Sequence, residues 1–264
     1  MLDVYLTLMK TSIIRGFQYR LGNYFYLIGM LIEPVVYLVV WSTIAREQGG
    51  SVEGFTPGDF AAYYIVWTLV RQMNIVFTPY GWEWRIKEGQ LAGQLLRPLH
   101  PVHYDLADIA GWKFVVIVLW FPVTVVLTLL FRPALSPTAL EIGVFAVAIW
   151  GAYLLRSMNQ TALGLITFWT TRASAMFETY FVAELLLSGR LVPLQLMPQW
   201  VQSLAGVLPF KWTFGYPIEA LTGDLSTAQL VGGLGMQALW TLAGWSLVTV
   251  MWRRAVRRFT SVGN

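Results

Sequence analysis

Long apolar runs separated by short polar segments dominate the chain and predict membrane-spanning helices. Six such runs follow one another, at residues 24–44, 60–80, 109–131, 139–170, 173–192 and 229–252. Crossing the hydrocarbon core of a bilayer takes about 20 residues of α-helix, so each run is long enough to span. The fourth run exceeds that length, and we expect it to tilt, kink or protrude. The pattern predicts an all-α, polytopic membrane protein with six transmembrane helices in a single transmembrane domain covering residues 1–264.

The N-terminal segment at residues 1–22 combines apolar with basic residues. Four large apolar residues recur there at helical spacing: Leu6, Met9, Ile13 and Phe17. Polar and basic side chains lie between them, which favours an amphipathic helix in the membrane interface over a short cytosolic tail. We therefore expect an N-terminal interfacial helix.

Residues 193–226 are apolar but cannot form one spanning helix. Four prolines interrupt them: Pro193, Pro198, Pro209 and Pro217. Proline removes a helical hydrogen bond and clashes with the preceding turn. Irregular backbone is tolerated in a membrane only where protein or water satisfies its polar groups. We expect short helices that dip part-way into the outer leaflet as a re-entrant segment.

Composition supports a membrane protein and removes several classes of chemistry. Hydrophobic residues make up 56% of the 264 residues and charged residues only 12%, about half the share usual in soluble domains. The chain contains no cysteine, which excludes disulfides, thiol catalysis and thiolate metal sites. The net charge is +4, but nucleic-acid binding would need basic and aromatic residues clustered on a soluble surface, and the sequence offers no such surface. We therefore expect no nucleic-acid partner.

The distribution of Lys and Arg predicts the orientation. Both chain ends and residues 81–108 are rich in these residues, whereas the opposite side holds few, namely Arg46, Arg132, Arg190 and Lys211. Cytoplasmic loops of membrane proteins carry the excess of positive charge. We therefore expect both termini in the cytosol, 81–108 as a cytosolic loop and 193–226 on the outer side.

Motifs for nucleotide, metal or catalytic chemistry are absent. The sequence has no G-x-x-x-x-G-K-[ST] loop to hold phosphates and no H-E-x-x-H motif to hold zinc. Both histidines, His100 and His103, lie in one loop with only Asp105 and Asp108 near them in sequence, too few ligands for a typical metal site. We assign no catalytic, cofactor-binding or metal-ligating residue and expect a chain that is not itself an enzyme.

Two stretches carry a family resemblance. The first reads EWRIKEGQL at residues 83–91, followed by LLRPL at residues 95–99. The second places SG at residues 188–189 ahead of the prolines and reads YPIEALTG at residues 216–223. In this order, and with the predicted topology, the whole chain resembles the permeases of type-two ABC exporters, and in particular a bacterial subgroup often encoded as permease pairs.

The resemblance implies a division of labour between subunits. In that family two permeases form the path and separate ABC ATPase subunits bind ATP and Mg, which fits the missing phosphate loop. The implied function is export of an amphipathic or lipid-like substrate through the bacterial cytoplasmic (inner) membrane, powered by ATP hydrolysis on the partner. The second permease would be another copy or a related chain, and the subgroup favours a heterodimer.

The resemblance also assigns the loop at residues 81–108 to a coupling helix that docks on the ATPase. The residues that match the family pattern are Glu83, Arg85, Lys87, Glu88, Gly89, Leu95, Arg97 and Pro98. The chemistry is compatible, because Leu91, Leu95 and Leu96 at helical spacing can offer an apolar stripe to a partner groove. The neighbouring charges can set its register. The alternative is a solvated loop that only connects two helices.

Four charged residues fall inside predicted spans: Glu33, Arg71, Arg156 and Glu184. Each costs roughly 2.5–3.5 kcal/mol at a helix centre on insertion scales, so lipid-facing positions are unfavourable. At about 1.5 Å per residue, Glu33 and Arg71 lie at matched depth, as do Arg156 and Glu184 to within about one turn. These pairs, with Asn74 near Arg71, either fix helix packing, which we favour, or line the export path.

The outer segment also has two interpretations. Its aromatic residues suit an anchor at the membrane interface, which the residues by themselves favour. The resemblance instead implies an outer gate, for which the candidates are Pro209, Tyr216, Pro217 and Glu219.

Two other protein classes are alternatives to an exporter permease. A polytopic membrane enzyme acting on lipid substrates would need acids or histidines clustered at one interface, and the carboxylates here are dispersed. A secondary transporter would predict internal inverted repeats, and none is visible in the sequence.

Overall fold

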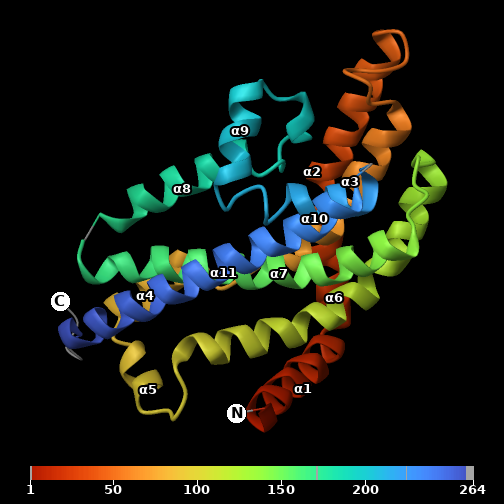
Figure 1. Ribbon diagram of the computed structural model, residues 1–264. Helices are drawn as coiled ribbons and strands as arrows, with labels where there is room; N and C mark the ends of the chain where they lie inside the picture. Colours follow the sequence, from red (N-terminus) through yellow and green to blue (C-terminus); the bar gives the residue numbers. More distant parts are fainter. Residues whose placement is uncertain (1, 171, 224, 260–264) are drawn as a thin grey trace.

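The computed structural model describes residues 2–170, 172–223 and 225–259, and this part of the chain is built from helices (Figure 1). The α-helices are α1 (Leu2–Gln18), α2 (Arg20–Glu47), α3 (Pro57–Met73), α4 (Pro79–Lys87), α5 (Leu91–Leu95), α6 (Pro101–Phe131), α7 (Ala139–Leu165), α8 (Ala173–Leu187), α9 (Gln199–Val207), α10 (Gly215–Thr222) and α11 (Thr227–Ala255). The short 3₁₀ helices are η1 (Ile166–Phe168), η2 (Leu194–Leu196) and η3 (Val256–Arg258).

Four helical stretches are long and apolar enough to cross a membrane: Leu21–Glu47, Pro101–Phe131, Ala139–Phe168 and Thr227–Arg258. They belong to α2, α6, α7 and α11, and they confirm the all-α class with several candidate membrane crossings. The helices at the other two predicted spans are shorter, since α3 has 17 residues and α8 has 15. Helix length alone therefore does not give the six crossings expected from the apolar runs.

Capping residues set the starts of several helices. α3, α7 and α11 begin directly after Thr56, Thr138 and Ser226, and each of these side chains accepts a hydrogen bond from the backbone N–H three residues later. The side chain at that later position, such as Glu141 in α7, accepts in return from the backbone of the capping residue. This reciprocal pair satisfies two backbone donors that the helix itself cannot. It fixes α7 to begin at Ala139, where the apolar run predicted.

The prediction of one spanning helix at residues 60–80 is wrong. α3 ends at Met73, residues 75–78 are non-helical, and α4 begins at Pro79. Proline disfavours the helical conformation in the residue before it. Thr78 is accordingly extended and caps α4 by accepting from the Gly81 N–H. The predicted loop at 81–108 is likewise partly helical, because it contains most of α4, all of α5 and the first turns of α6.

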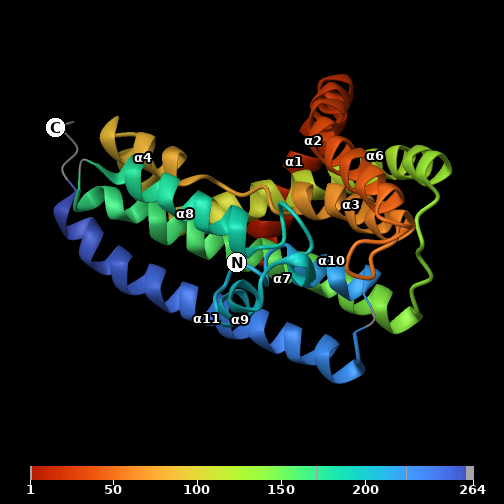
Figure 2. The ribbon, with the colours of Figure 1, turned by 90° about the horizontal axis from the view of Figure 1, so that it is seen from above.

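α7 lies in the middle of the helix bundle, and α11 packs along it (Figures 1 and 2). α4 and α10 also pack against α7: Trp82 of α4 lies against Gly164, and Tyr216 of α10 belongs to a buried cluster with Val144 and Ala148. α3 packs on α10 and α6, and α2 packs along α3. α7 is therefore a common packing partner of α4, α10 and α11.

α1 packs along α6 rather than standing free. The approach is close, because a Cβ added at Gly111 of α6 would lie 2.5 Å from the Met9 carbonyl oxygen. A Cβ added at Gly16 of α1 would likewise lie 2.8 Å from Val115 Cγ2 of α6. The predicted N-terminal helix is thus present, and small residues on both helices set where it docks.

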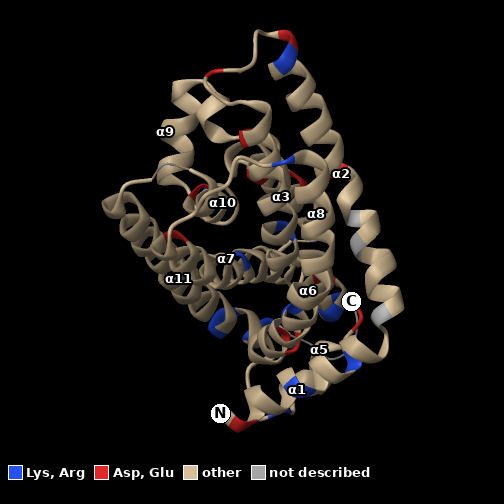
Figure 3. Cartoon of the chain, turned by 90° about the vertical axis from the view of Figure 1, so that its right-hand side faces the viewer, with Lys and Arg blue, Asp and Glu red and all other residues tan. Residues whose placement is uncertain are grey.

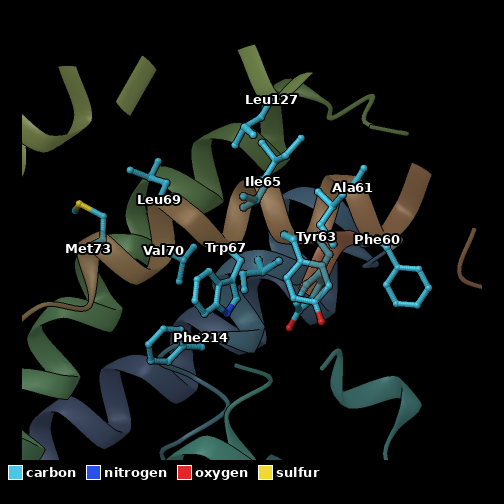
Figure 4. Packing of buried hydrophobic residues seen from close by; sticks show 14 of the residues in the cluster. Phe60, Ala61, Tyr63, Ile65, Trp67, Leu69, Val70, Met73, Leu127 and Phe214 are labelled. Carbon is cyan, nitrogen blue, oxygen red and sulfur yellow. The ribbon is translucent and has the colours of Figure 1, made fainter. Parts of the chain in front are cut away.

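α3 forms the largest buried cluster (Figure 4). Almost every residue from Phe60 to Met73 is buried, on all sides of the helix. In Figure 4, Trp67 and Tyr63 of α3 lie on the same side of the helix as Phe214, which directly precedes α10. Leu127 of α6 lies on another side of α3. A helix that is apolar all round is one that other elements surround. α3 is consequently the core helix, although it is shorter than the four candidate spans.

Candidate functional site

Charged residues are sparse along the helices (Figure 3), and the buried charged side chains of the described residues include Lys113, Glu184 and Glu219. Some of these sparse charges, with the aromatic residues of α3, hold two stretches of irregular backbone. The first stretch is residues 188–193, after α8, and the second is residues 74–78, between α3 and α4. Both lie where the sequence predicted continuous spanning helix.

Aromatic side chains of α3 bind the backbone that follows α8. The Tyr63 hydroxyl donates to the Gly189 carbonyl at 2.6 Å, and the Trp67 Nε1–H donates to the Arg190 carbonyl at 3.1 Å. Tyr64 donates to the next carbonyl, that of Leu191, at 3.1 Å. Three successive carbonyls are thereby satisfied by one helix. Irregular backbone in a membrane requires such partners.

Lys113 of α6 caps the C-terminal end of α3. Its side chain is fully buried, and its Nζ donates to the carbonyls of Gln72 at 3.2 Å and Ile75 at 2.7 Å. The ammonium also lies 4.4 Å from the centre of the Tyr153 ring. A cation is favourable at a helix C-terminus because the last carbonyls have no partner within the helix. This role was not predicted from the sequence, because a Lys near the end of an apolar run is typical of a flanking charge.

Arg156 of α7 binds both α8 and the break in α3. Its Nε and Nη2 donate to the two carboxylate oxygens of Glu184 at 2.8 and 2.7 Å, and its Nη1 donates to the Asn74 carbonyl. The Glu184 side chain is 1% exposed. The pairing expected from matched depth is therefore present. This bidentate geometry is the strongest form of an arginine–carboxylate contact.

Glu33 of α2 has two cationic partners. It pairs with Arg71 of α3, as expected from depth, and with Arg190 after α8 at 3.4 Å. Tyr37, one turn along α2, donates to the same carboxylate at 3.4 Å. The distribution of Lys and Arg predicted Arg190 on the outer side but did not predict its contact with Glu33. Glu33 therefore ties α2 to both α3 and the irregular backbone at 188–193.

Asn74 is the junction between the broken helix and the outer segment. Its Nδ2 donates to the Val70 carbonyl at 3.0 Å and to the Thr213 carbonyl at 2.7 Å. Its Oδ1 is buried and has no hydrogen-bond partner among the described residues. Asn74 consequently binds Thr213, which lies just before α10, through its side chain, while its own carbonyl accepts from Arg156.

The outer gate candidates pack into the protein. Tyr216 is buried and donates to the Leu230 carbonyl at 2.5 Å, which joins α10 to α11. Glu219 is buried and pairs with Lys211 at 3.2 Å. Pro217 is buried within the first turn of α10, whereas Pro209 is half-buried in the turn before it. The structure thus brings three of the four candidates onto α10.

The charged residues of α4 form ion pairs of two kinds, one to α6 and one within α4 itself. Arg85 donates to both carboxylate oxygens of Asp105 in α6, at 2.7 and 2.8 Å, and its guanidinium lies 3.6 Å from the centre of the Phe77 ring. Its side chain is only 12% exposed, so this residue attaches α4 to α6. Glu83 pairs with Lys87 at 2.6 Å along α4 itself.

Other predicted coupling residues lie on the surface. Lys87, Glu88, Arg97 and Pro98 are exposed. Gly89 follows α4 with φ of +67°, a left-handed conformation that glycine adopts without steric cost and that ends helices. The chain therefore turns sharply between α4 and α5 with these polar groups outward.

The prediction that Leu91, Leu95 and Leu96 offer one apolar stripe to a partner is wrong in part. Leu91 is fully buried and Leu95 packs against the same core, because α5 folds back onto the protein. Leu96 is 89% exposed, and Trp84 of α4 is 57% exposed. Trp84 was not among the predicted coupling residues, although a tryptophan beside alternating charges was a visible signal. The large apolar side chains most exposed in this segment are thus Trp84 and Leu96.

The two histidines take part in capping and aromatic packing at the start of α6. No group of three or more potential ligands lies together in the described part of the chain. His100 caps α6, since its Nδ1 accepts from the Val102 N–H at 3.2 Å, and its ring packs 4.1 Å from that of Trp252. Burial, followed by the neighbouring His103, lowers the pKa of His100 to about 4. The ring is therefore neutral at pH 7 and acts as a hydrogen-bond acceptor.

Comparison with protein-family models gives a match over most of the chain. The family model described as ABC-2 family transporter protein matches residues 31–263, which includes both stretches of irregular backbone and the α4–α5 segment. No curated protein matches the chain.

Proposed function

Because the chain belongs to the ABC-2 transporter family, a family of membrane transport permeases, we propose that it is one permease subunit of an ATP-driven exporter. A separate ABC ATPase would bind and hydrolyse ATP with Mg and pass its movement to this chain. The observation that carries this proposal is the α4–α5 segment, which is anchored on one face and presents apolar and charged groups on the other.

The anchored face connects the segment to three helices. Trp82 is fully buried against Gly164 of α7, and Arg85 holds Asp105 of α6. Tyr80 is hydrogen-bonded to Glu178 of α8 and its ring lies 5.1 Å from that of Phe177. Displacement of α4 by a partner would therefore move α6, α7 and α8 together.

The outward face has the chemistry of a docking surface. Trp84 and Leu96 are exposed large apolar side chains, and Lys87, Glu88 and Arg97 surround them with charge. An aromatic anchor rimmed by charges is typical of a protein interface, where the anchor supplies affinity and the charges supply register. We propose that this face docks on the ATPase.

Six membrane crossings fit the structure if α3 and α8 also span. At about 1.5 Å per residue they are about 25 and 22 Å long, against a hydrocarbon core of about 30 Å. The irregular stretches 74–78 and 188–193 extend them, and the contacts to their carbonyls from Lys113, Arg156 and the α3 aromatics support burial of this backbone in a membrane. With six crossings, both termini and α4–α5 lie on the cytosolic side and 193–226 is a re-entrant segment of the outer leaflet.

The cargo in this proposal is amphipathic or lipid-like, and the membrane is the bacterial cytoplasmic membrane. The ion pairs Glu33–Arg71 and Arg156–Glu184 support an apolar path, because each charge is already compensated inside the chain. Two permeases, identical or related, would enclose that path.

Co-purification in mild detergent tests the proposal. The chain is expressed with the ABC ATPase encoded beside it, either as wild type, as Trp84→Ala with Leu96→Ala, or as Trp200→Ala. Trp200 is 70% exposed on α9, far from α4 in the chain, and is the matched control. We expect the wild type and the control to retain the ATPase and the double variant to lose it. Retention by all three forms rejects this docking face, and loss by all three rejects the ATPase partner.

A further inference from the structure

A crevice of about 170 Å³ lies between the first turn of α6 and the last turns of α11. Its walls are His100 and His103 from α6 and Trp245, Val248, Trp252 and Arg253 from α11. The crevice takes no part in the proposed ATPase docking.

The crevice exists because α11 is packed on α7 and not on α6. Gly244 brings α11 so close to α7 that an added Cβ would lie 2.8 Å from Met158 Cβ. Met158 is buried and lines the crevice from α7. The tryptophans of α11 lie near the histidines, since the ring centres of His103 and Trp245 are 5.6 Å apart. Met158 and Val248 consequently give the crevice an apolar part.

The charge of the crevice is positive. None of the lining residues is Asp or Glu, and Arg253 is exposed at the rim without an ion pair to any described carboxylate. The neighbouring imidazoles add no charge at neutral pH where they are held as acceptors, as His100 is by the Val102 N–H. Arg254, Arg257 and Arg258 follow in sequence, but none of them lines the crevice.

We propose that this crevice binds one anionic glycerophospholipid. The acyl chain would lie against Met158 and Val248, the tryptophans would flank the ester region, and Arg253 would bind the phosphate. Basic pockets between membrane helices on the cytosolic side recognise anionic headgroups, and tryptophan is favoured at that depth. The inference rests on the membrane placement of α6 and α11, and on the proposed orientation only for the leaflet.

Native mass spectrometry of the purified chain with dioleoyl phosphatidylglycerol and dioleoyl phosphatidylcholine tests this site. We expect one phosphatidylglycerol to be retained in preference to phosphatidylcholine. Arg253→Gln should weaken that binding about fivefold, the value of one interfacial cation. Arg254→Gln removes the same charge from the same helix end but outside the crevice, and it should change the affinity less than about twofold.

Two further measurements separate the site from general attraction. Trp245→Leu should reduce retention of phosphatidylglycerol, while millimolar glycerol phosphate should not compete, because the acyl contacts are required. An unchanged melting temperature without added lipid shows that each variant is folded, and Arg253→Lys should keep the binding. Equal retention of the two lipids, or equal losses in Arg253→Gln and Arg254→Gln, overturns the proposal. Loss of ATPase co-purification leaves these lipid results unaffected, so the two proposals fail separately.

Discussion

Arg156 and Glu184 form a two-point ion pair between α7 and α8, with nitrogen–oxygen distances of 2.8 and 2.7 Å. The third nitrogen of the same guanidinium donates to the carbonyl of Asn74, where α3 has ended. One side chain therefore connects the central helix, the lightly packed α8 and the broken core helix. In a bundle with so few internal charges, this relationship is the main polar contact between those three elements.

Removing one member of this pair should destabilise the protein more than removing both. Glu184→Gln leaves a buried guanidinium without its counter-charge, and breaking a buried pair costs about 3–5 kcal/mol. Arg156→Met with Glu184→Met removes both charges and should recover part of that loss. Thermal unfolding in detergent measures the difference. If the double variant is no more stable than Glu184→Gln, the pair is not self-compensating and a direct role in the path gains support.

Lys113→Met should loosen the break between α3 and α4. The substitution leaves the Gln72 and Ile75 carbonyls buried without their donor, which costs about 1–3 kcal/mol. Because the natural chain has no cysteine, Phe77→Cys can report on this segment through its rate of maleimide labelling. We expect faster labelling in Lys113→Met and an unchanged rate in Lys10→Met, whose side chain is exposed on α1. Equal rates in the two backgrounds would show that Lys113 does not hold the break.

Arg85→Ala should reduce stability rather than merely weaken a partner interface. It leaves Asp105 buried without the two hydrogen bonds that α4 supplies, and a lost charge-assisted contact of this kind costs about 1.5–3 kcal/mol. The exposed neighbour Lys87 is the control, because Lys87→Ala removes only a surface pair worth at most about 1 kcal/mol. Melting temperatures of the isolated chain compare them. Similar temperatures for the two variants would mean that Arg85 does not attach α4 to α6.

Stability should fall on acidification through His100. Its pKa in the folded chain is about 4, below the usual value of about 6.5, so the unfolded chain binds the proton more tightly. The contribution to stability is complete above about pH 6.5 and is lost as the pH falls towards 4. His100→Asn keeps a side-chain acceptor for capping α6 but does not titrate in this range. We expect its melting temperature to decline less between pH 7 and pH 5 than that of the wild type, and equal declines would remove His100 as a cause.

The apolar pattern predicted where most helices lie because hydrophobic length is a local property. α7 begins at Ala139 and α8 at Ala173, as the runs indicated. The pattern failed at residues 74–78, where Asn74 and Pro79 end and restart helix inside an apolar stretch. There the backbone is satisfied by Lys113 and Arg156, which come from helices distant in sequence.

Contacts between helices that are neighbours in sequence could be predicted, whereas contacts that depend on the whole fold could not. Depth along helices was sufficient to pair Glu33 with Arg71, since those helices are antiparallel neighbours. Arg190 joined that cluster only because three α3 aromatic residues draw its backbone inward. The Leu91 side chain was assigned to a partner groove because spacing gives one face of a helix, and only the fold decides that this face meets the core.

Single-cysteine labelling on this cysteine-free chain tests the central claim, that α4–α5 is the cytosolic face on which an ATPase docks. Gln90→Cys and Gly93→Cys, at exposed positions of the same segment that leave the proposed anchors in place, report on that face. Glu53→Cys, exposed between α2 and α3, reports on the opposite end. In oriented membranes, we predict that positions 90 and 93 react only with reagent on the cytosolic side and are protected when the ATPase is bound. Position 53 should react only from the outside and be unaffected by the ATPase. Labelling of position 90 from the outside, or equal labelling with and without bound ATPase, would contradict this claim.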